Sequence, residues 1–566
     1  MQYPRDIRGQ NLFALDVNLQ RTLARIAPEA AARWSGHLSD FGAWVGGEVD
    51  TEAEYTDRHG RPALEAFDRN GDLVNRIRVN PLWEAASRGA YERGVVGLNY
   101  IDDPAPFAVT FAMGYILAQA DISLHCPVTM TGAVAYVLDR FAPAPVKETY
   151  LHHLTRMDGG ALSGGTWATE LHGGSDVGAT TTVARKDGEH FRLDGLKWFT
   201  SNPDGGLAVA TARPEGAAEG SDGLGLYLVP ARLEDGSPNR FRIRRLKDKL
   251  GTCGIATGEI DLTGTWALEV APPPDGIRVM MEALEFSRLH NAMAAIGLQR
   301  RAFLEAVAYA SRRRAFGHVI TEYPMVQDEI LNLLAGLEAG CALAFEAVRA
   351  FDRATAGDGG RPWMRLVTAL AKHHTAEQAN VACRAAMEIM GGNAYTYDHV
   401  TPRLVCDAQV LTIWEGPANI QALEMLRLLG NRYPGYEAFT GRIDGILGAA
   451  PEGLGPLAAV VDNAYGACRE AVAYVQGDAR EAERHARKLL GLMADTLAAG
   501  LLLEEAGEAH AAGDGRKALV ARLFAERHLA PPARRGIGPG ADWAQRHFDA
   551  LAGYQAVAPS AVGLPA

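Results

Sequence analysis

The sequence predicts a mainly α-helical protein that contains a central β-domain and carries extra helices at its C-terminal end. Hydrophobic residues recur at helical spacing over most of the chain, but in the second quarter they fall in short runs separated by Gly, Pro and Asp. The chain of 566 residues is also too long for a single hydrophobic core. We therefore expect four segments, with bounds 1–165, 166–276, 277–432 and 433–566.

The first segment is expected to be helical with one long loop. Helical spacing of apolar residues is clearest at 11–25 and 106–120. A Gly- and Asp-rich stretch at 57–72 interrupts this pattern and predicts a loop.

The second segment is expected to be a β-domain. Its apolar residues form short runs, each bounded by residues that favour turns. These runs are 190–195, 207–212, 225–229, 241–246 and 258–262.

The third segment predicts an antiparallel four-helix bundle. Its long helical patterns are 280–316, 324–355, 362–390 and 417–429. A Gly- and Pro-rich stretch after Asn431, continuing to Pro456, then predicts a linker. Further helical sequence to about His528 predicts an added helical domain.

Composition limits the function classes that fit this chain. The 56 basic and 68 acidic residues give a formal charge of −12, which disfavours general attraction to nucleic acid or to anionic membranes. The six cysteines are scattered without a C-x-x-C pair, as expected in a reduced compartment with neither a zinc site nor a disulfide framework. We expect neither a secretory leader nor a membrane span, because no uninterrupted apolar stretch is long enough. The expected location is cytoplasmic.

Glu415 is the most informative candidate residue. An apolar run at 410–414 predicts a short strand that delivers this carboxylate to a Gly-Pro turn, and a helix is expected to begin at Pro417. Burial raises the pKa of a carboxyl group in such a position, whereas the helix dipole lowers it. Glu415 is therefore a candidate general base, with a purely structural carboxylate as the alternative.

A Gly-rich turn at 166–177 is a second candidate. Gly173 and Gly174, followed by Ser175 and Asp176, offer backbone N–H groups and hydroxyls that suit a phosphate or the edge of a heterocycle. An ordinary hairpin loop would have the same pattern.

An aromatic cluster follows at 195–202. Trp198, at the end of an expected strand, can stack on a planar cofactor while Thr200 hydrogen-bonds its polar rim. A tryptophan of the hydrophobic core is the alternative.

Three motifs, in order along the chain, resemble those of the acyl-CoA dehydrogenases, a family of flavoproteins. They lie at 169–176, at 309–317 and at 388–416, and the resemblance spans roughly residues 80–430. It implies an N-terminal helical domain, a β-barrel-like middle domain and a four-helix bundle. The added C-terminal helices and the long N-terminal part are similar to the AidB-like, or alkylation-response, subgroup.

The resemblance also implies a reaction, a cofactor and partners. Glu415 is implied to remove the α-proton of an acyl-CoA while the β-hydrogen leaves as hydride to FAD, and Ser175 and Arg288 are implied to contact the substrate. The FAD-binding residues implied are Thr166, Trp167, Thr169, Gly174, Ser175, Trp198, Phe199, Thr200, Arg313, Phe316, Glu388, Gly391, Gly392, Trp414, Gly416 and Asn419. Electron transfer flavoprotein is the implied acceptor, and a homo-oligomer built as a dimer of dimers is the implied assembly.

Several positions depart from the family pattern. Pro324, Pro417 and Ala394 stand where the family has a glutamine, a small hydroxyl residue and a glycine. Some members carry the base just before the arginine that Arg288 matches, where this chain has Ser287. The chain therefore offers Glu415 as the base.

The subgroup implies an alternative function, a flavoprotein that binds duplex DNA in an alkylation-damage response with little dehydrogenase activity. The tail at 441–566 has 13 basic and 15 acidic residues, whereas nonspecific duplex binding needs clustered Lys and Arg. The candidate basic groups are Arg484, Arg487 and Lys488, at helical spacing, and Arg534 with Arg535. We favour the dehydrogenase and regard these groups as solvated surface residues.

Overall fold

The computed structural model describes residues 4–430, 432, 434–532, 540 and 542–563. Its contacts divide the chain into two compact units. Residues 47–290 form one, called here the sheet unit. Residues 1–46 and 291–566 form the other, called the bundle unit. Helix α8 (Asp275–Ala310) contributes residues to both.

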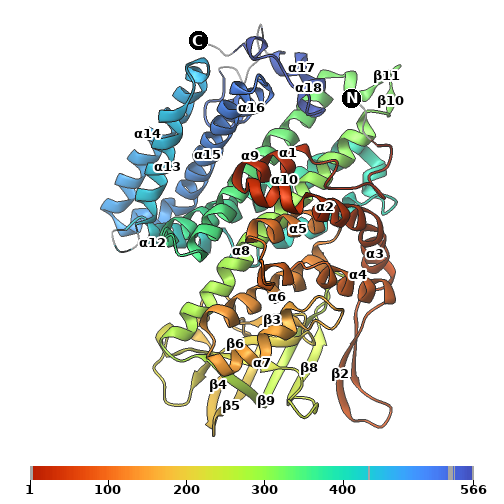
Figure 1. Cartoon of the computed structure of the whole chain (residues 1–566), viewed down its shortest axis with the longest axis vertical. Coiled ribbons are helices and arrows are strands. Elements are labelled where there is room, and N and C mark those ends of the chain that lie inside the picture. The colour runs from red at the N-terminus through yellow and green to blue at the C-terminus, as the bar shows by residue number, and fades with distance from the viewer. Residues whose placement is uncertain (1–3, 431, 433, 533–539, 541, 564–566) are drawn as a thin grey trace. The chain divides into compact units, whose positions relative to one another are not determined.

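The sheet unit is built on a seven-stranded sheet that closes on itself within the described residues (Figure 1). Strand β6 pairs with β4 along one edge and with β7 along the other, and β9 joins β5 to β7, so these five strands form a ring. Strand β3 adds to β6 and β8 adds to β9. The strands are β3 (Ser163–Trp167), β4 (Val183–Asp187), β5 (His190–Ser201), β6 (Gly206–Pro214), β7 (Gly225–Pro230), β8 (Phe241–Leu246) and β9 (Thr257–Ala271). The predicted β-barrel-like domain is confirmed.

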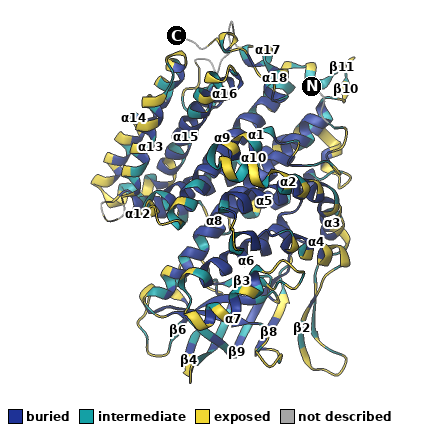
Figure 2. Ribbon diagram, in the orientation of Figure 1, coloured by how far each residue is buried: buried dark blue, intermediate teal, exposed yellow. Residues whose placement is uncertain are grey.

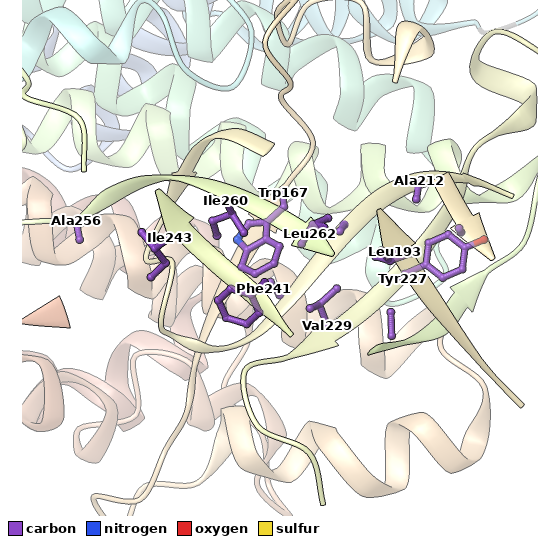
Figure 3. Close-up of a cluster of buried hydrophobic side chains, with 14 of the residues drawn as sticks. Trp167, Leu193, Ala212, Tyr227, Val229, Phe241, Ile243, Ala256, Ile260 and Leu262 are labelled. Carbon is purple, nitrogen blue, oxygen red and sulfur yellow. The ribbon is translucent and has the colours of Figure 1, made fainter. Parts of the chain in front are cut away.

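A hydrophobic core fills the space between these strands (Figure 3). Successive side chains of a strand point to opposite faces, so alternate residues of each strand turn inward. Trp167 and Phe241 meet edge to face there, with ring centroids 5.7 Å apart. Leu193, Ile260 and the neighbouring apolar residues complete the cluster.

The sheet unit also contains helices, among which α6 contacts strands β3, β6 and β9. They are α3 (Asp50–His59), α4 (Pro81–Glu92), α5 (Phe107–Ala120), α6 (Ile122–Phe141) and α7 (Ala144–Thr155). Helices α5 and α6 are buried along nearly their whole length (Figure 2). The hydroxyl of Thr131 on α6 accepts a hydrogen bond from the backbone N–H of Gly164 on β3, at 2.8 Å. This contact fixes the strand that leads into the Gly-rich turn.

The stretch at 57–72 corrects our expectation of a long loop. It contains the end of α3 and strand β1 (Ala63–Phe67), which pairs in antiparallel fashion with β2 (Leu73–Arg78). Asp68 closes the intervening turn by accepting hydrogen bonds from the N–H groups of Asn70 and Asp72. The Asp and Gly residues that predicted a loop therefore mark only the turn of a hairpin.

The bundle unit is helical. Its helices are α1 (Val17–Ile26), α2 (Pro28–Trp44), α9 (Pro324–Thr355), α10 (Arg361–Met390), α11 (Thr401–Leu411), α12 (Ala418–Leu428), α13 (Gly435–Ala449), α14 (Gly455–Gly477), α15 (Ala479–Ala511), α16 (Arg516–His528), α17 (Trp543–Arg546) and α18 (Phe548–Ala552). Helix α1 begins at Val17 rather than at residue 11, because Asp16 caps it. Helix α8 ends at Ala310 rather than at residue 316, and a short hairpin of β10 (Arg314–Ala315) and β11 (His318–Val319) follows.

The C-terminal helices pack against the bundle, and the expected linker is wrong where α13 forms. Helix α15 contacts α9, α10 and α12, and α16 contacts α9. Arg442 of α13 forms ion pairs with Glu346 of α9 and with Glu504 of α15. Helix α13 forms despite its glycines, because its amphipathic pattern buries Phe439, Ile443 and Ile446.

Helix α9 is long and apolar enough to cross a membrane by length and composition alone. Its most apolar window is 89% buried inside the protein. Glu338 and Glu346 interrupt the apolar sequence, and both lie in the protein interior. Its apolar character is therefore that of a helix in a protein core.

Candidate functional site

Glu415 lies in a turn between α11 and α12, not at the end of a strand. Helix α11 continues through Leu411, because Leu404, Ala408 and Leu411 bury one helical face. The chain then turns, and Pro417 caps α12 rather than forming its first residue. The predicted strand at 410–414 and the predicted start of the helix at Pro417 are therefore both corrected.

The backbone of this turn is left-handed at two successive residues. Glu415 has φ +58° and Gly416 has φ +93°. A residue with a side chain pays about 1–2 kcal/mol in this region, so the surrounding structure must hold it. Gln421 Nε2 donates to the carbonyl oxygens of Glu415 and Gly416, each at 3.0 Å, and Lys372 Nζ donates to that of Gly416 at 2.9 Å.

Further predicted residues of the bundle unit belong to the second and third motifs. The second and third motifs meet where the side-chain amide of Asn393 donates to the hydroxyl of Tyr309, at 3.1 Å. Phe316 lies in the β10–β11 hairpin with φ +49°, and its side chain is 95% exposed. A Cβ built on Gly391 or Gly392 would meet nothing within 4 Å. This surface therefore offers an aromatic ring and an open backbone.

The remaining predicted residues of the bundle unit are Arg313, Asn419, Glu388 and Trp414. Arg313 and Asn419 are exposed, and Glu388 is exposed and paired with Arg384 at 2.6 Å. Trp414 is half-buried, and its indole N–H has no hydrogen-bond partner in the described part of the chain.

In the sheet unit, the Gly-rich turn and the aromatic cluster lie together. The backbone N–H of Trp198 donates to the carbonyl oxygen of Thr169, at 2.9 Å. Gly174 lies so close to the Thr169 hydroxyl that a Cβ there would stand 2.5 Å from it. Ser175, beyond this contact, is exposed. The turn therefore presents a hydroxyl and backbone groups to the outside.

Glu170 holds this turn from the inside. Its carboxylate accepts hydrogen bonds from the N–H and hydroxyl groups of Thr181 and Thr182, and it pairs with the ammonium of Lys197 at 2.9 Å. Both charged side chains are buried. Burial alone would raise the pKa of Glu170, but Lys197 and the two threonine hydroxyls lower it to about 2. The residue is an ionised structural anchor.

The aromatic and hydroxyl side chains near the end of strand β5 differ in how far they are buried. Trp198 lies inside the strand, and the ammonium of Lys247 stands 3.4 Å from its ring centroid. Phe199 is exposed. The hydroxyl of Thr200 is buried and donates to the carbonyl oxygen of Gly258 at 2.7 Å, whereas Ser201 is only half-buried. A bulge between Lys197 and Thr200 produces this arrangement.

Three further residues of the sheet unit differ in burial. Trp167 belongs to the core cluster and faces away from the surface, while its neighbour Thr166 is half-buried. The alternation of β3 turns Trp167 inward. Ser201, the second hydroxyl residue of the 195–202 cluster, is half-buried, and its hydroxyl lies 3.0 Å from that of Thr257.

Arg288 lies buried on α8 and forms an ion pair with Glu285, one turn earlier. Ser287 between them is buried, and its hydroxyl has no hydrogen-bond partner within the described ranges. Glu285 is a buried carboxylate that sequence reasoning overlooked, although its i, i+3 spacing to Arg288 was readable. Among the described residues, no group of three or more His, Cys, Asp and Glu side chains is placed to hold a metal ion.

Comparison with known families and proteins gives consistent matches. The acyl-CoA dehydrogenase C-terminal domain matches residues 274–429, and the middle domain of the same family matches residues 165–265. The N-terminal domain of the adaptive response protein AidB matches residues 2–158. These three matches follow one another along the chain, as the three motifs do.

Individual relatives agree with these matches. Acyl-CoA dehydrogenase family member 11 of Caenorhabditis elegans is 32% identical over 455 residues, which cover 77% of this chain and 74% of that protein. AidB of Escherichia coli (strain K12) is 30% identical over 449 residues, which cover 77% of this chain and 81% of AidB. The crystal structure of C. elegans ACDH-11 in complex with C11-CoA matches with a TM-score of 0.87 at 27% identity, over 97% of this chain and 96% of that one. The chain belongs to the acyl-CoA dehydrogenase family, with AidB and ACDH-11 as homologues.

Proposed function

We propose that the protein is an FAD-dependent acyl-CoA dehydrogenase that removes hydrogens from the α- and β-carbons of a CoA thioester, with Glu415 as the base. The observation that carries this proposal is the left-handed turn at Glu415 and Gly416, which buried side chains hold within the family's C-terminal domain. The C. elegans relative crystallised with C11-CoA supports a CoA thioester as the substrate class.

Members of this family are FAD-binding flavoproteins, and the residues present fit that cofactor. Phe199 offers an exposed ring for stacking, and Ser175 and Ser201 offer hydroxyls in the same unit. Phe316 and the open backbone at Gly391 and Gly392 would hold the dinucleotide end. When bound, FAD supplies the acceptor for the hydride that leaves the β-carbon.

The chain's own residues carry the proton transfer and the orientation. The thioester carbonyl acidifies the α-carbon, and a Glu415 carboxylate oxygen takes the α-proton as a general base. The hydrogen bonds from Gln421 and Lys372 to the turn fix the direction from which the carboxylate approaches. Substrate in the site excludes water, which strengthens these electrostatic interactions.

We also propose a homo-oligomer, a dimer of dimers, in which the surface of Phe316 faces a second copy. Exposed apolar side chains of the bundle unit support this, namely Phe316, Met325, Tyr395 and Ile413. Electron transfer flavoprotein as the acceptor and a cytoplasmic location are proposals that rest on the resemblance and on composition.

Product analysis tests the proposed reaction. The purified holoprotein is incubated with an artificial electron acceptor and, in turn, with short, branched and long acyl-CoAs. We expect mass spectrometry to detect a CoA thioester that has lost two hydrogens, for at least one chain class. Recovery of every thioester unchanged would contradict the proposal.

The DNA-binding alternative leads to a separate prediction. Arg484 pairs with Glu481 at 3.0 Å and Arg487 with Glu377 at 2.9 Å, so two of the candidate cations are already neutralised locally. Arg534 and Arg535 lie outside the described residues. We expect duplex affinity no tighter than the nonspecific range, about 10⁻⁴–10⁻⁶ M at physiological salt, by fluorescence anisotropy. Nanomolar binding that weakens steeply with salt would favour the alternative.

A further inference from the structure

We infer that Lys372 and Gln421 are positioning residues for the base, a role that rests on the proposed function of Glu415. Neither side chain is expected to touch the substrate. Both act through the backbone carbonyl oxygens of Glu415 and Gly416, and so determine where the Glu415 carboxylate points.

The backbone conformation of Glu415 must be stabilised by other residues. A side-chain-bearing residue at φ +58° sits in a sparsely populated region, and Gly416 follows at φ +93°. The next residue, Pro417, has no N–H with which to stabilise the turn. If φ of Glu415 relaxed to the common negative range, the Cα–Cβ bond would point elsewhere and carry the carboxylate with it.

Gln421 supplies the hold from the following helix. Its side chain is fully buried, and its single amide group donates to both carbonyl oxygens of the turn, at 3.0 Å each. It stands within the first turns of α12, after the cap at Pro417. Gln421 therefore joins the strained turn to the start of the helix.

Lys372 supplies the hold from the bundle interior. It lies on α10, 1% exposed, and its ammonium donates to the carbonyl oxygen of Gly416 at 2.9 Å. Burying a charged group is costly, and an apolar side chain of similar length would fill the same space without that cost. The bond to Gly416 gives the buried ammonium an acceptor at the turn and joins α10 to it.

The same helix offers a matched control. Asn380, two turns further along α10, donates from its side-chain amide to the carbonyl oxygen of Ala408 on α11, at 3.0 Å. This contact also joins α10 to a neighbouring segment through a carbonyl. It does not involve the turn at Glu415 and Gly416.

The test compares Lys372→Met, Gln421→Leu and Asn380→Leu, all as FAD-loaded full-length protein. Anaerobic stopped-flow mixing with acyl-CoA gives the limiting rate of flavin reduction and, from its concentration dependence, the Kd. For the first two variants we expect a limiting rate about 10- to 100-fold lower, with the Kd and FAD content little changed. Asn380→Leu should keep the unsubstituted rate. Lys372→Arg, which retains a cationic donor, should recover part of it.

A second readout separates positioning from general damage. In a Glu415→Gln background, adding Lys372→Met or Gln421→Leu should lower the residual rate little further, because the group they position is gone. Amide hydrogen exchange should rise at 412–420 in the two variants but not in Asn380→Leu.

The outcomes of the two proposals can be told apart. If Glu415→Gln strongly slows reduction while Lys372→Met and Gln421→Leu behave like Asn380→Leu, the positioning role is overturned and the dehydrogenase stands. If the losses persist undiminished in the Glu415→Gln background, the positioning role is also overturned. If acyl-CoA fails to reduce the unsubstituted protein, both proposals fall.

Discussion

Glu415→Gln is expected to lower the limiting rate of flavin reduction by acyl-CoA about 10²- to 10⁴-fold, the usual contribution of a positioned general base. The amide has the size of the carboxylate but does not accept the α-proton. Because the turn is held through backbone carbonyls, the substitution leaves its hydrogen bonds from Gln421 and Lys372 in place. Anaerobic stopped-flow absorbance measures the rate, with FAD content and Kd as internal checks.

Two companion variants sharpen this result. Glu437→Gln replaces an exposed glutamate of α13 in the same unit and should leave the rate unchanged. Glu285→Gln replaces the buried carboxylate that pairs with Arg288 on α8. If the Glu285 variant loses reduction and the Glu415 variant keeps it, the base has been assigned to the wrong residue.

Glu338→Gln is expected to destabilise the protein by about 3–5 kcal/mol, the cost of breaking a buried ion pair from one side. Glu338 of α9 is 0% exposed, and its carboxylate pairs with Arg516 at 2.6 Å and with Lys517 at 2.5 Å, both on α16. Substitution leaves two buried cations without this counter-charge. Thermal unfolding of the holoprotein, with limited proteolysis of the C-terminal helices, measures the effect.

A surface pair provides the control for this variant. Glu84→Gln removes an exposed partner of Arg88 and should cost at most about 1 kcal/mol. An equal effect of the two substitutions would show that the contact between α9 and α16 does not stabilise the protein as expected.

The Glu338 cluster also predicts a pH dependence. Burial alone would raise the pKa of Glu338, but Arg516 and Lys517 lower it from 4.5 to about 2. A lowered carboxyl pKa in the folded protein means that the contribution is complete above about pH 4.5 and is lost as the pH falls toward 2. Unfolding measured across this window should therefore lose part of its acid sensitivity in Glu338→Gln.

The long periodic segments could be predicted from the sequence because each buries one continuous face. Helix α9 was expected at 324–355 and strand β8 at 241–246, and both have these bounds in the structure. The hairpin at 63–78 was missed because its strands are short and, apart from Ile77, its apolar residues are not buried. Helix α13 was missed because we gave its glycines more weight than the helical spacing of its apolar residues.

The geometry of the candidate site could be predicted from the sequence less well than the long helices. Glu415 could be found from its motif. Its left-handed backbone could not, because Lys372, one of the buried donors that hold the turn, lies far away in the sequence. The burial of the Thr200 hydroxyl depends on a bulge in β5, which follows from pairing with β9 rather than from local sequence. Long-range pairing of this kind leaves no periodic signal along the chain.

The most direct test of the central claim is an anaerobic titration of the purified yellow holoprotein with short, branched and long acyl-CoAs, following the visible flavin band. The account predicts that at least one chain class bleaches the band in the unsubstituted protein and that Glu415→Gln slows this bleaching at least about 100-fold. A flavin that stays oxidised with every thioester would contradict the assignment of the protein as a dehydrogenase.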